Sequence, residues 1–304
     1  MDIFQKILIS LQKIKVKEVM EIKGTLIPIG GNEDKGSELS DGYELDFVTE
    51  GILSHVVSES GGPNSKIVVI PTASSIPVEV GENYKKAFTE LGCTDLQILD
   101  IRSKEDAENP ANIAQVADAD CIMFSGGDQS KIVDKIGDTA MHELLIKRYH
   151  EEPIVIAGTS AGAMAMSNEM IEGGSSKESL IKGSVHMRDG MGLIPGLIID
   201  THFIQRGRFG RVTEAVAKFP NLLGVGLAED TGLIIKHANE FTVIGSGMVI
   251  LFDPSHLSHN NFKILDEGTP MTIANLTVHV LANGDTFTIN KRELKVYPIE
   301  AVPI

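Results

Sequence analysis

The stretch EEPIVIAGTSAGAMAMSNEM (residues 151–170) contains the pattern that decides the expected fold. Its segment 153–157 (PIVIA) is short, apolar and partly β-branched, which is typical of a buried strand. The segment 161–170 is rich in alanine and methionine and favours a helix. Between them, residues 158–162 (GTSAG) fit the pattern G-x-S-x-G, which places a serine on a sharp strand-to-helix turn. We therefore expect Ser160 to be an exposed nucleophile, with a tight turn and an incidental serine as the alternative.

Strand-like and helix-like segments alternate through the first two thirds of the chain. Apolar runs and helical spacing predict strands at 24–30, 66–74, 96–100 and 121–129 and helices at 41–60, 77–92 and 111–120. This order is typical of an α/β fold with a mostly parallel sheet and helices on both faces. Four clusters of glycine and polar residues (IGGNEDKG, PTASS, FSGGDQ and AGTSAG) follow four of the expected strands. Because the carboxyl edge of such a sheet carries the site, we expect the clusters to meet there.

The rhythm changes at about residue 221, where short strands and glycine turns replace the helices. We interpret this part as a β-rich extension of one domain that spans residues 24–304. The segment 275–290 (NLTVHVLANGDTFTIN) is expected to form a hairpin around Ala-Asn-Gly-Asp, and 171–184 to form a flexible flap. Residues 1–23 are apolar and interrupted by lysines, which predicts an amphipathic N-terminal helix.

The composition excludes several classes of protein. The chain has 304 residues, a net charge of −15 and a pI of about 5.0, and such an acidic surface repels nucleic acid and anionic membranes. No apolar run approaches the ~20 residues of a membrane span, and the N-terminal pattern lacks the features of a signal peptide. The two cysteines, Cys93 and Cys121, have no metal-binding spacing, and a reducing compartment fits them. We therefore expect a cytoplasmic protein that needs no metal or cofactor.

A nucleophilic serine needs a base and a residue that orients the base. Of the nine histidines, His202 lies two positions after a strand-like run, GLIID (196–200), and so stands at the carboxyl end of a strand in the same layer as Ser160. The run GVGLAEDTG places Glu229 and Asp230 at the end of another strand, where alternation points them to opposite faces. Asp230 suits the Asp-Thr-Gly turn, which favours Glu229 as the acid. The order serine, histidine, acid differs from the order in α/β-hydrolases.

Three arginines follow the candidate base within a few positions: Arg206, Arg208 and Arg211. An arginine fork binds carboxylate or phosphate groups through two parallel hydrogen bonds. Their place after His202 favours contact with the anionic groups of a substrate, and charge on a helix surface is the alternative.

Six motifs occur together and in order: GGNEDKG, PTAS, FSGGDQ, AGTSAGA, DTHFIQRGRFGR and LAEDTG. With them, the chain from about Gly24 to its end resembles the cyanophycinases, serine exopeptidases of the dipeptidase E (S51) type. The resemblance implies a flavodoxin-like sheet related to class I glutamine amidotransferases, with serine in place of their cysteine. It implies hydrolysis of cyanophycin, a poly-aspartate backbone with arginine on each β-carboxyl, to β-Asp-Arg dipeptides. It also implies a homodimer.

The resemblance assigns roles to individual residues. Ser160 would be the nucleophile, His202 the base and Glu229 the residue that orients the base. The N–H groups of Gly127 and Ala161 would stabilise the oxyanion. The positions that match the family's substrate contacts are Gln129, Asp200, Arg206, Arg208 and Arg211.

One residue departs from the family pattern: Thr201 stands where a glutamine is expected before the histidine. This difference leaves open the fine substrate preference, including that between β-Asp-Arg and β-Asp-Lys. A general isoaspartyl or acidic dipeptidase that acts on short β-linked peptides is therefore a second hypothesis. A non-catalytic binding protein that kept the fold is a third, and the presence of Ser160, His202 and Glu229 argues against it.

Overall fold

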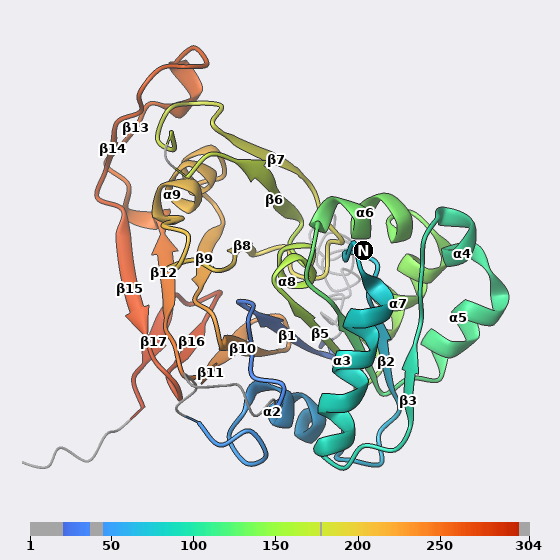
Figure 1. Cartoon of the computed structure of the whole chain (residues 1–304). Helices are drawn as coiled ribbons and strands as arrows, with labels where there is room; N and C mark the ends of the chain where they lie inside the picture. The colour runs from blue at the N-terminus through green and yellow to red at the C-terminus, as the bar shows by residue number, and fades with distance from the viewer. Residues whose placement is uncertain (1–20, 37–44, 177, 298–304) are drawn as a thin grey trace, which may run out of the picture.

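A nine-stranded sheet forms the centre of the computed structural model, which describes residues 21–36, 45–176 and 178–297 (Figure 1). Its parallel half consists, in spatial order, of β1 (Thr25–Ile29), β5 (Val155–Thr159), β4 (Cys121–Phe124), β2 (Ile67–Ile70) and β3 (Leu96–Ile98). Beyond β1 follow the antiparallel strands β10 (Thr231–Lys236), β11 (Glu240–Gly245), β16 (Thr286–Thr288) and β17 (Glu293–Lys295). The expected α/β fold is confirmed, and the sheet is mixed because C-terminal strands extend it.

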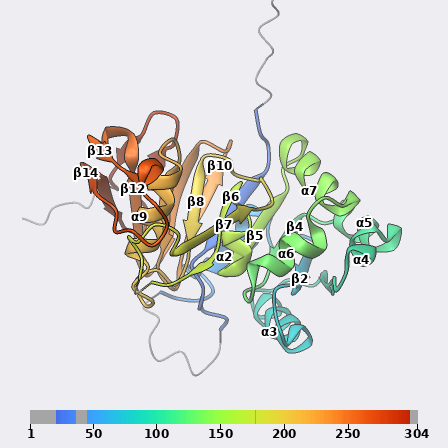
Figure 2. The same cartoon turned by 90° about the horizontal axis from the view of Figure 1, so that it is seen from above.

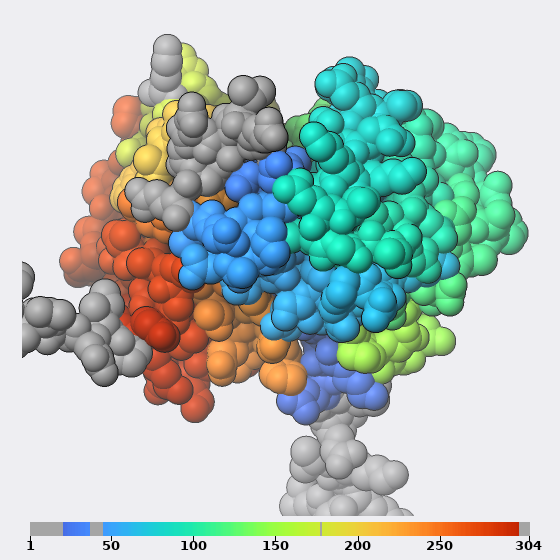
Figure 3. Space-filling view, turned by 60° about the horizontal axis from the view of Figure 1, so that its bottom comes forward, coloured from blue at the N-terminus to red at the C-terminus, as the bar shows by residue number. Residues whose placement is uncertain are grey.

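Helices cover both faces of the parallel strands because the strand residues alternate between two apolar clusters. In β1, Leu26 packs into one cluster and Ile27 and Ile29 into the other. One face carries α2 (Ile52–Glu59) and α3 (Pro77–Glu90), which Figure 3 shows side by side in blue and cyan. The other face carries α4 (Lys104–Glu108), α5 (Pro110–Ala117), α6 (Gln129–Ile136), α7 (Ala140–Glu151) and α8 (Ala161–Met164). Figure 2 shows α3 and α7 on opposite sides of β4.

A second, four-stranded sheet lies beside the first. Its order is β15 (Thr277–Leu281), β12 (Val249–Asp253), β9 (Leu223–Leu227) and β8 (Leu197–Asp200). Helix α9 (Phe209–Lys218) packs on this sheet through a third apolar cluster, which includes Val212, Val216 and Phe252. Two short antiparallel pairs complete the strands: β6 (Glu169–Gly174) pairs with β7 (Val185–Asp189), and β13 (His259–Asn260) pairs with β14 (Ile273–Ala274). Short 3₁₀ turns lie at Pro254–His256 and Phe262–Ile264. The β-rich part expected from about residue 221 is confirmed.

The helix expected at 161–170 is much shorter than predicted, because α8 makes one turn before the chain enters β6. Backbone groups from a distant segment take over its carbonyl oxygens. The N–H of Met191 donates to the carbonyl of Ala165 at 2.7 Å, and the N–H of Ile194 donates to that of Met166 at 3.0 Å. These bonds occupy the acceptors that a longer helix would use.

The hairpin expected at 275–290 is wrong. The turn forms, but β15 pairs with β12 in the second sheet, whereas β16 pairs with β11 in the first. The N–H of Gly284 donates to the carbonyl of Val243, and the N–H of Val243 donates to that of Asp285, both at 2.9 Å. These bonds fix the turn on β11, so the segment links the two sheets.

The flap expected at 171–184 is only partly a loop, because residues 171–174 belong to β6. The buried carboxylate of Glu214 holds its end by accepting hydrogen bonds from the N–H groups of Gly183 at 2.9 Å and Val185 at 3.2 Å.

The expected N-terminal helix, residues 1–23, lies outside the described residues except for 21–23, which are not helical. The boundary of the domain at residue 24 therefore stays a prediction. Within the described ranges, no helix combines the length and the apolar character needed to cross a membrane.

Candidate active site

A sharp elbow carries Ser160 between β5 and α8. Its backbone has φ +50° and ψ −107°, a region that non-glycine residues rarely adopt. A Cβ at Gly158 would lie 2.6 Å from the carbonyl carbon of Gly162, and a Cβ at Gly162 would lie 2.7 Å from the carbonyl oxygen of Phe124. Both glycines are therefore needed for strand and helix to pass this closely. The N–H of Ser160 donates to the carbonyl of Ile29 at 2.9 Å, which ties the elbow to β1.

His202 reaches the elbow from the second sheet. It follows β8, which is not in the same sheet as β5, so the expectation of a shared layer is wrong. Its N–H donates to the carbonyl of Gly30 at 2.8 Å, and this bond joins the end of β8 to the end of β1. The imidazole lies directly on Gly31, where any Cβ would overlap the ring. Gly31 thus makes room for a histidine that comes from the other sheet, whereas a Cβ at Gly30 would overlap the carbonyl oxygen of Ala228.

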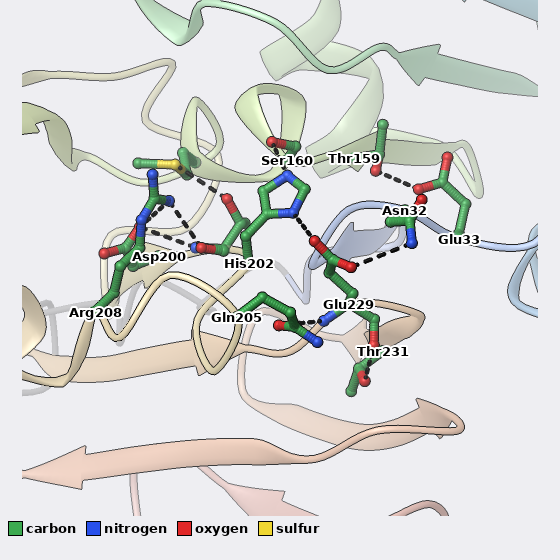
Figure 4. Close-up of polar contacts among 12 residues, drawn as sticks. Asn32, Glu33, Thr159, Ser160, Asp200, His202, Gln205, Arg208, Glu229 and Thr231 are labelled. Carbon is green, nitrogen blue, oxygen red and sulfur yellow. Dashed lines mark hydrogen bonds and ion pairs between the residues drawn. The ribbon is translucent and has the colours of Figure 1, made fainter. Parts of the chain in front are cut away.

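The side chains of Ser160, His202 and Glu229 form a line of two hydrogen bonds (Figure 4). Nδ1 of His202 lies 2.7 Å from Oε1 of Glu229, and Nε2 lies 2.9 Å from Oγ of Ser160. Because a carboxylate only accepts, Nδ1 must carry the hydrogen, and Nε2 is then free to accept the serine proton. The arrangement has the geometry of a nucleophile, a base and an orienting acid.

Glu229 lies between β9 of the second sheet and β10 of the first. Its Oε2 accepts a hydrogen bond from Nδ2 of Asn32 at 3.2 Å, and its carbonyl accepts one from the hydroxyl of Thr231 at 2.9 Å (Figure 4). The neighbouring Asp230 points elsewhere, since its carboxylate accepts from the hydroxyl of Ser246 at 2.6 Å. This geometry favours Glu229 over Asp230 as the acid.

The expected oxyanion donors lie at the same edge. Gly127 lines the pocket beside Ser160 and has φ +141°, and a Cβ there would overlap the carbonyl oxygen of Ala73. Ala161 opens α8, so its N–H is one of the helix's free donors. Neither N–H donates to an acceptor among the residues that the structure describes.

A cavity of about 660 Å³ surrounds the serine. Its wall includes Glu33, Lys35, Asn83, Tyr84, Arg206 and Glu229, so it combines acidic, basic and aromatic side chains. The cavity is large enough for a small peptide.

Sequence reasoning missed Glu33, which lies on this wall. Its buried carboxylate accepts hydrogen bonds from the hydroxyls of Tyr84 and Thr159, both at 2.5 Å, and pairs with Nζ of Lys35 at 2.9 Å. Burial alone would raise the pKa of the Glu33 carboxyl, but the charge of Lys35 and the two hydroxyls outweigh burial and lower it. The cluster GGNEDKG marks this segment in the sequence as part of the site, but residue spacing does not indicate which residues Glu33 contacts.

The five residues expected to contact the substrate differ in their burial and in their hydrogen-bond partners. Asp200 is fully buried and pairs with Arg208 at 2.9 Å (Figure 4). It also pairs with Arg211 at 3.1 Å, so these two arginines serve an internal carboxylate. Burial raises the pKa of Asp200, although both arginines act to lower it. Gln129 donates its amide to two carbonyls of β6. Of the five, Arg206 is the one that lines the cavity and is exposed.

Thr201, the departure from the family pattern, is buried. Its hydroxyl donates to Sδ of Met164 at 3.4 Å. It does not belong to the wall of the cavity. Among the described residues, no group of three or more histidine, cysteine, aspartate or glutamate side chains is arranged to hold a metal ion.

An α/β sheet that carries a serine on a strand-to-helix elbow, in line with a histidine and a carboxylate, defines a hydrolase of the serine type. A family model described as Peptidase family S51 matches residues 37–243, and the chain belongs to this family. It is therefore a serine peptidase.

Curated relatives extend this similarity over nearly the whole chain. A cyanophycinase from Trichormus variabilis is 34% identical over 286 residues, which cover 93% of this chain and 92% of that protein. A cyanophycinase from Geminocystis herdmanii is 34% identical over 268 residues, 88% of this chain and 94% of that protein. Among solved structures, a peptidase from an acI-B1 actinobacterium has a TM-score of 0.61 at 20% identity and covers 88% of this chain and 98% of its own. That likeness shows the fold.

Proposed function

We propose that the chain is a cyanophycinase that hydrolyses cyanophycin to β-Asp-Arg dipeptides through Ser160, His202 and Glu229. The family and the names of the curated relatives support the substrate. The observation that carries the mechanism is the hydrogen-bonded line from Ser160 through His202 to Glu229, at 2.9 and 2.7 Å.

The geometry supports a sequence of two half-reactions. Nε2 of His202 takes the proton of Ser160 as Oγ attacks the carbonyl carbon of the scissile amide. The N–H groups of Gly127 and Ala161 stabilise the negative oxygen that forms. His202 then gives the proton to the leaving amine, which leaves an ester on Ser160, and a water activated in the same way hydrolyses it. Glu229 stabilises the imidazolium in both halves.

A second candidate is a peptidase for short β-linked aspartyl peptides. Two observations favour it. Arg208 and Arg211 are occupied by Asp200, and the cavity of about 660 Å³ suits a short peptide. The two candidates share the chemistry at Ser160 and differ in the length of substrate that they accept.

The proposal includes a homodimer in the cytoplasm. Both cysteines are free and buried, which fits a reducing compartment. Light scattering on the purified protein tests the dimer, and fractionation of the host cell tests the compartment.

The deciding experiment incubates purified protein with cyanophycin beside the variant Ser160→Ala and identifies the products by mass. Release of β-Asp-Arg by the wild type and none by the variant supports the proposal. If the polymer stays intact but short β-linked peptides are cleaved with the same need for Ser160, the second candidate replaces the first.

A further inference from the structure

The proposed mechanism leaves one charged pair in the cavity without a role. Glu33 is fully buried, whereas the side chain of Lys35 is 31% exposed and lines the same cavity as Ser160. Nζ of Lys35 lies 2.9 Å from Oε1 of Glu33, donates to the Glu33 carbonyl at 3.3 Å and stands 5.1 Å from the centre of the Tyr84 ring. The ammonium is thus held in one place by a carboxylate, a carbonyl and an aromatic face.

Glu33 is itself fixed to the elbow. Thr159, which donates to Glu33, directly precedes Ser160 in the chain. The position of the Lys35 ammonium is therefore tied to the nucleophile through the ion pair with Glu33, the hydrogen bond from Thr159 and the peptide bond between Thr159 and Ser160. Such a fixed cation loses little conformational entropy when it binds a ligand.

Lys35 also has an N–H group that finds no acceptor among the described residues. An ammonium has three N–H groups, and both hydrogen-bond acceptors of Lys35 among the described residues belong to Glu33. Arg208 and Arg211 form ion pairs with Asp200 and do not line the cavity. Lys35 and Arg206 therefore supply the positive charge of the cavity wall.

We propose that Lys35 is a specificity-determining residue that binds a free carboxylate of the substrate, and that Glu33 is the positioning residue that holds it. The inference rests on the proposed function, because β-linked aspartyl peptides carry free carboxylates next to their amide bonds. The charge-assisted hydrogen bond favours a carboxylate over an uncharged carboxamide of the same shape.

The test compares (β-Asp-Arg)₂ with the analogue in which every free carboxylate is a carboxamide. The wild type should favour the acid. Lys35→Met should lower kcat/KM for the acid about 10- to 100-fold, mainly through KM, and change the amide less than about 2-fold. Lys35→Arg keeps the charge and should retain part of the preference. An equal loss on both substrates would overturn the proposal, because it would mean that Lys35 only neutralises Glu33.

A double variant guards against a folding defect. Lys35→Met leaves the buried Glu33 carboxylate without its cation, whereas Lys35→Met with Glu33→Gln removes both charges. The double variant should fold and cleave the amide, yet still lack the preference for the acid. If it prefers the acid as strongly as the wild type, Lys35 does not bind the carboxylate.

A binding measurement separates this inference from the proposed function. Calorimetry on Ser160→Ala should show tighter binding of the acid than of the amide, and the difference should vanish in Ser160→Ala with Lys35→Met. If the wild type cleaves neither compound but this binding difference appears, the role of Lys35 stands and the proposed reaction falls. If neither compound is cleaved or bound, both are wrong.

Discussion

The carboxylate of Glu229 lies 2.7 Å from Nδ1 of His202 and fixes which nitrogen of the ring carries the hydrogen. Replacement by glutamine keeps the shape but removes the negative charge and replaces one of the two acceptor oxygens by an NH2 donor. We expect Glu229→Gln to lower kcat about 10³- to 10⁴-fold with little change in KM, because the imidazolium loses its partner. Steady-state kinetics on a β-linked peptide measures this. A loss of less than about 10-fold would show that Glu229 does not orient the base.

Gly127 tests the expected oxyanion site. Alanine at this position must displace the loop, because its Cβ would overlap the carbonyl oxygen of Ala73 and its φ is +141°. We expect Gly127→Ala to lower kcat about 10²- to 10³-fold as the N–H moves off the oxyanion. The matched control is Gly173→Ala, since a Cβ at Gly173 meets no atom within 4 Å. Equal activity of the two variants would place the oxyanion donor elsewhere.

Asp200 should matter for stability. Asp200→Asn removes the charge that pairs with the largely buried Arg208 and Arg211. We expect the free energy of unfolding in urea to fall by about 3–5 kcal/mol, because two buried cations lose their partner. Arg206→Met is the control, since Arg206 is exposed and should change stability by less than about 0.5 kcal/mol. A small effect of Asp200→Asn would mean that water reaches the arginines.

The lowered pKa of Glu33 predicts a pH dependence of stability. A carboxyl whose pKa is lower in the folded than in the unfolded chain stabilises the fold above its unfolded pKa, which is about 4.3 for glutamate. This contribution is lost as the pH falls through the lower, folded value. The Tm difference between wild type and Glu33→Gln should therefore be largest near neutral pH and shrink below about pH 4. A constant difference would contradict an ionised Glu33.

Both cysteines should resist alkylation in the folded protein. Burial raises the pKa of Cys121 to about 12 and also raises that of Cys93, so neither forms appreciable thiolate at neutral pH. Mass spectrometry after iodoacetamide at pH 8 should find no label in the native protein and two labels in concentrated urea. Labelling of the native protein would show that local opening exposes a cysteine.

Local patterns allowed much of the fold to be predicted from the sequence. The parallel strands are recognisable in the sequence as apolar runs. Gly158 and Gly162 mark the elbow, because strand and helix are in contact there and leave no space for a Cβ. The pairing of strands is a long-range property. The turn at 282–285 can be recognised from its sequence. No local pattern, however, indicates that β11 holds this turn, so that β15 and β16 pair in different sheets.

Prediction of the site has the same limit. A strand that ends in a histidine is recognisable, and so His202 could be singled out. The burial of Asp200 against Arg208 and Arg211 could not, since an arginine-rich segment looks the same whether it faces an internal or an external carboxylate. Glu33 was missed for the same reason: its partner Thr159 is 126 positions away in the chain.

The triad draws on both sheets, and this has a consequence for the growing chain. During synthesis, Ser160 leaves the ribosome before the second sheet is complete and well before Glu229 is made. Until the N–H of His202, after β8, has bonded to the carbonyl of Gly30, after β1, the serine has no base beside it. Both sheets must therefore be in place before Ser160 has the base and the acid that its activation needs.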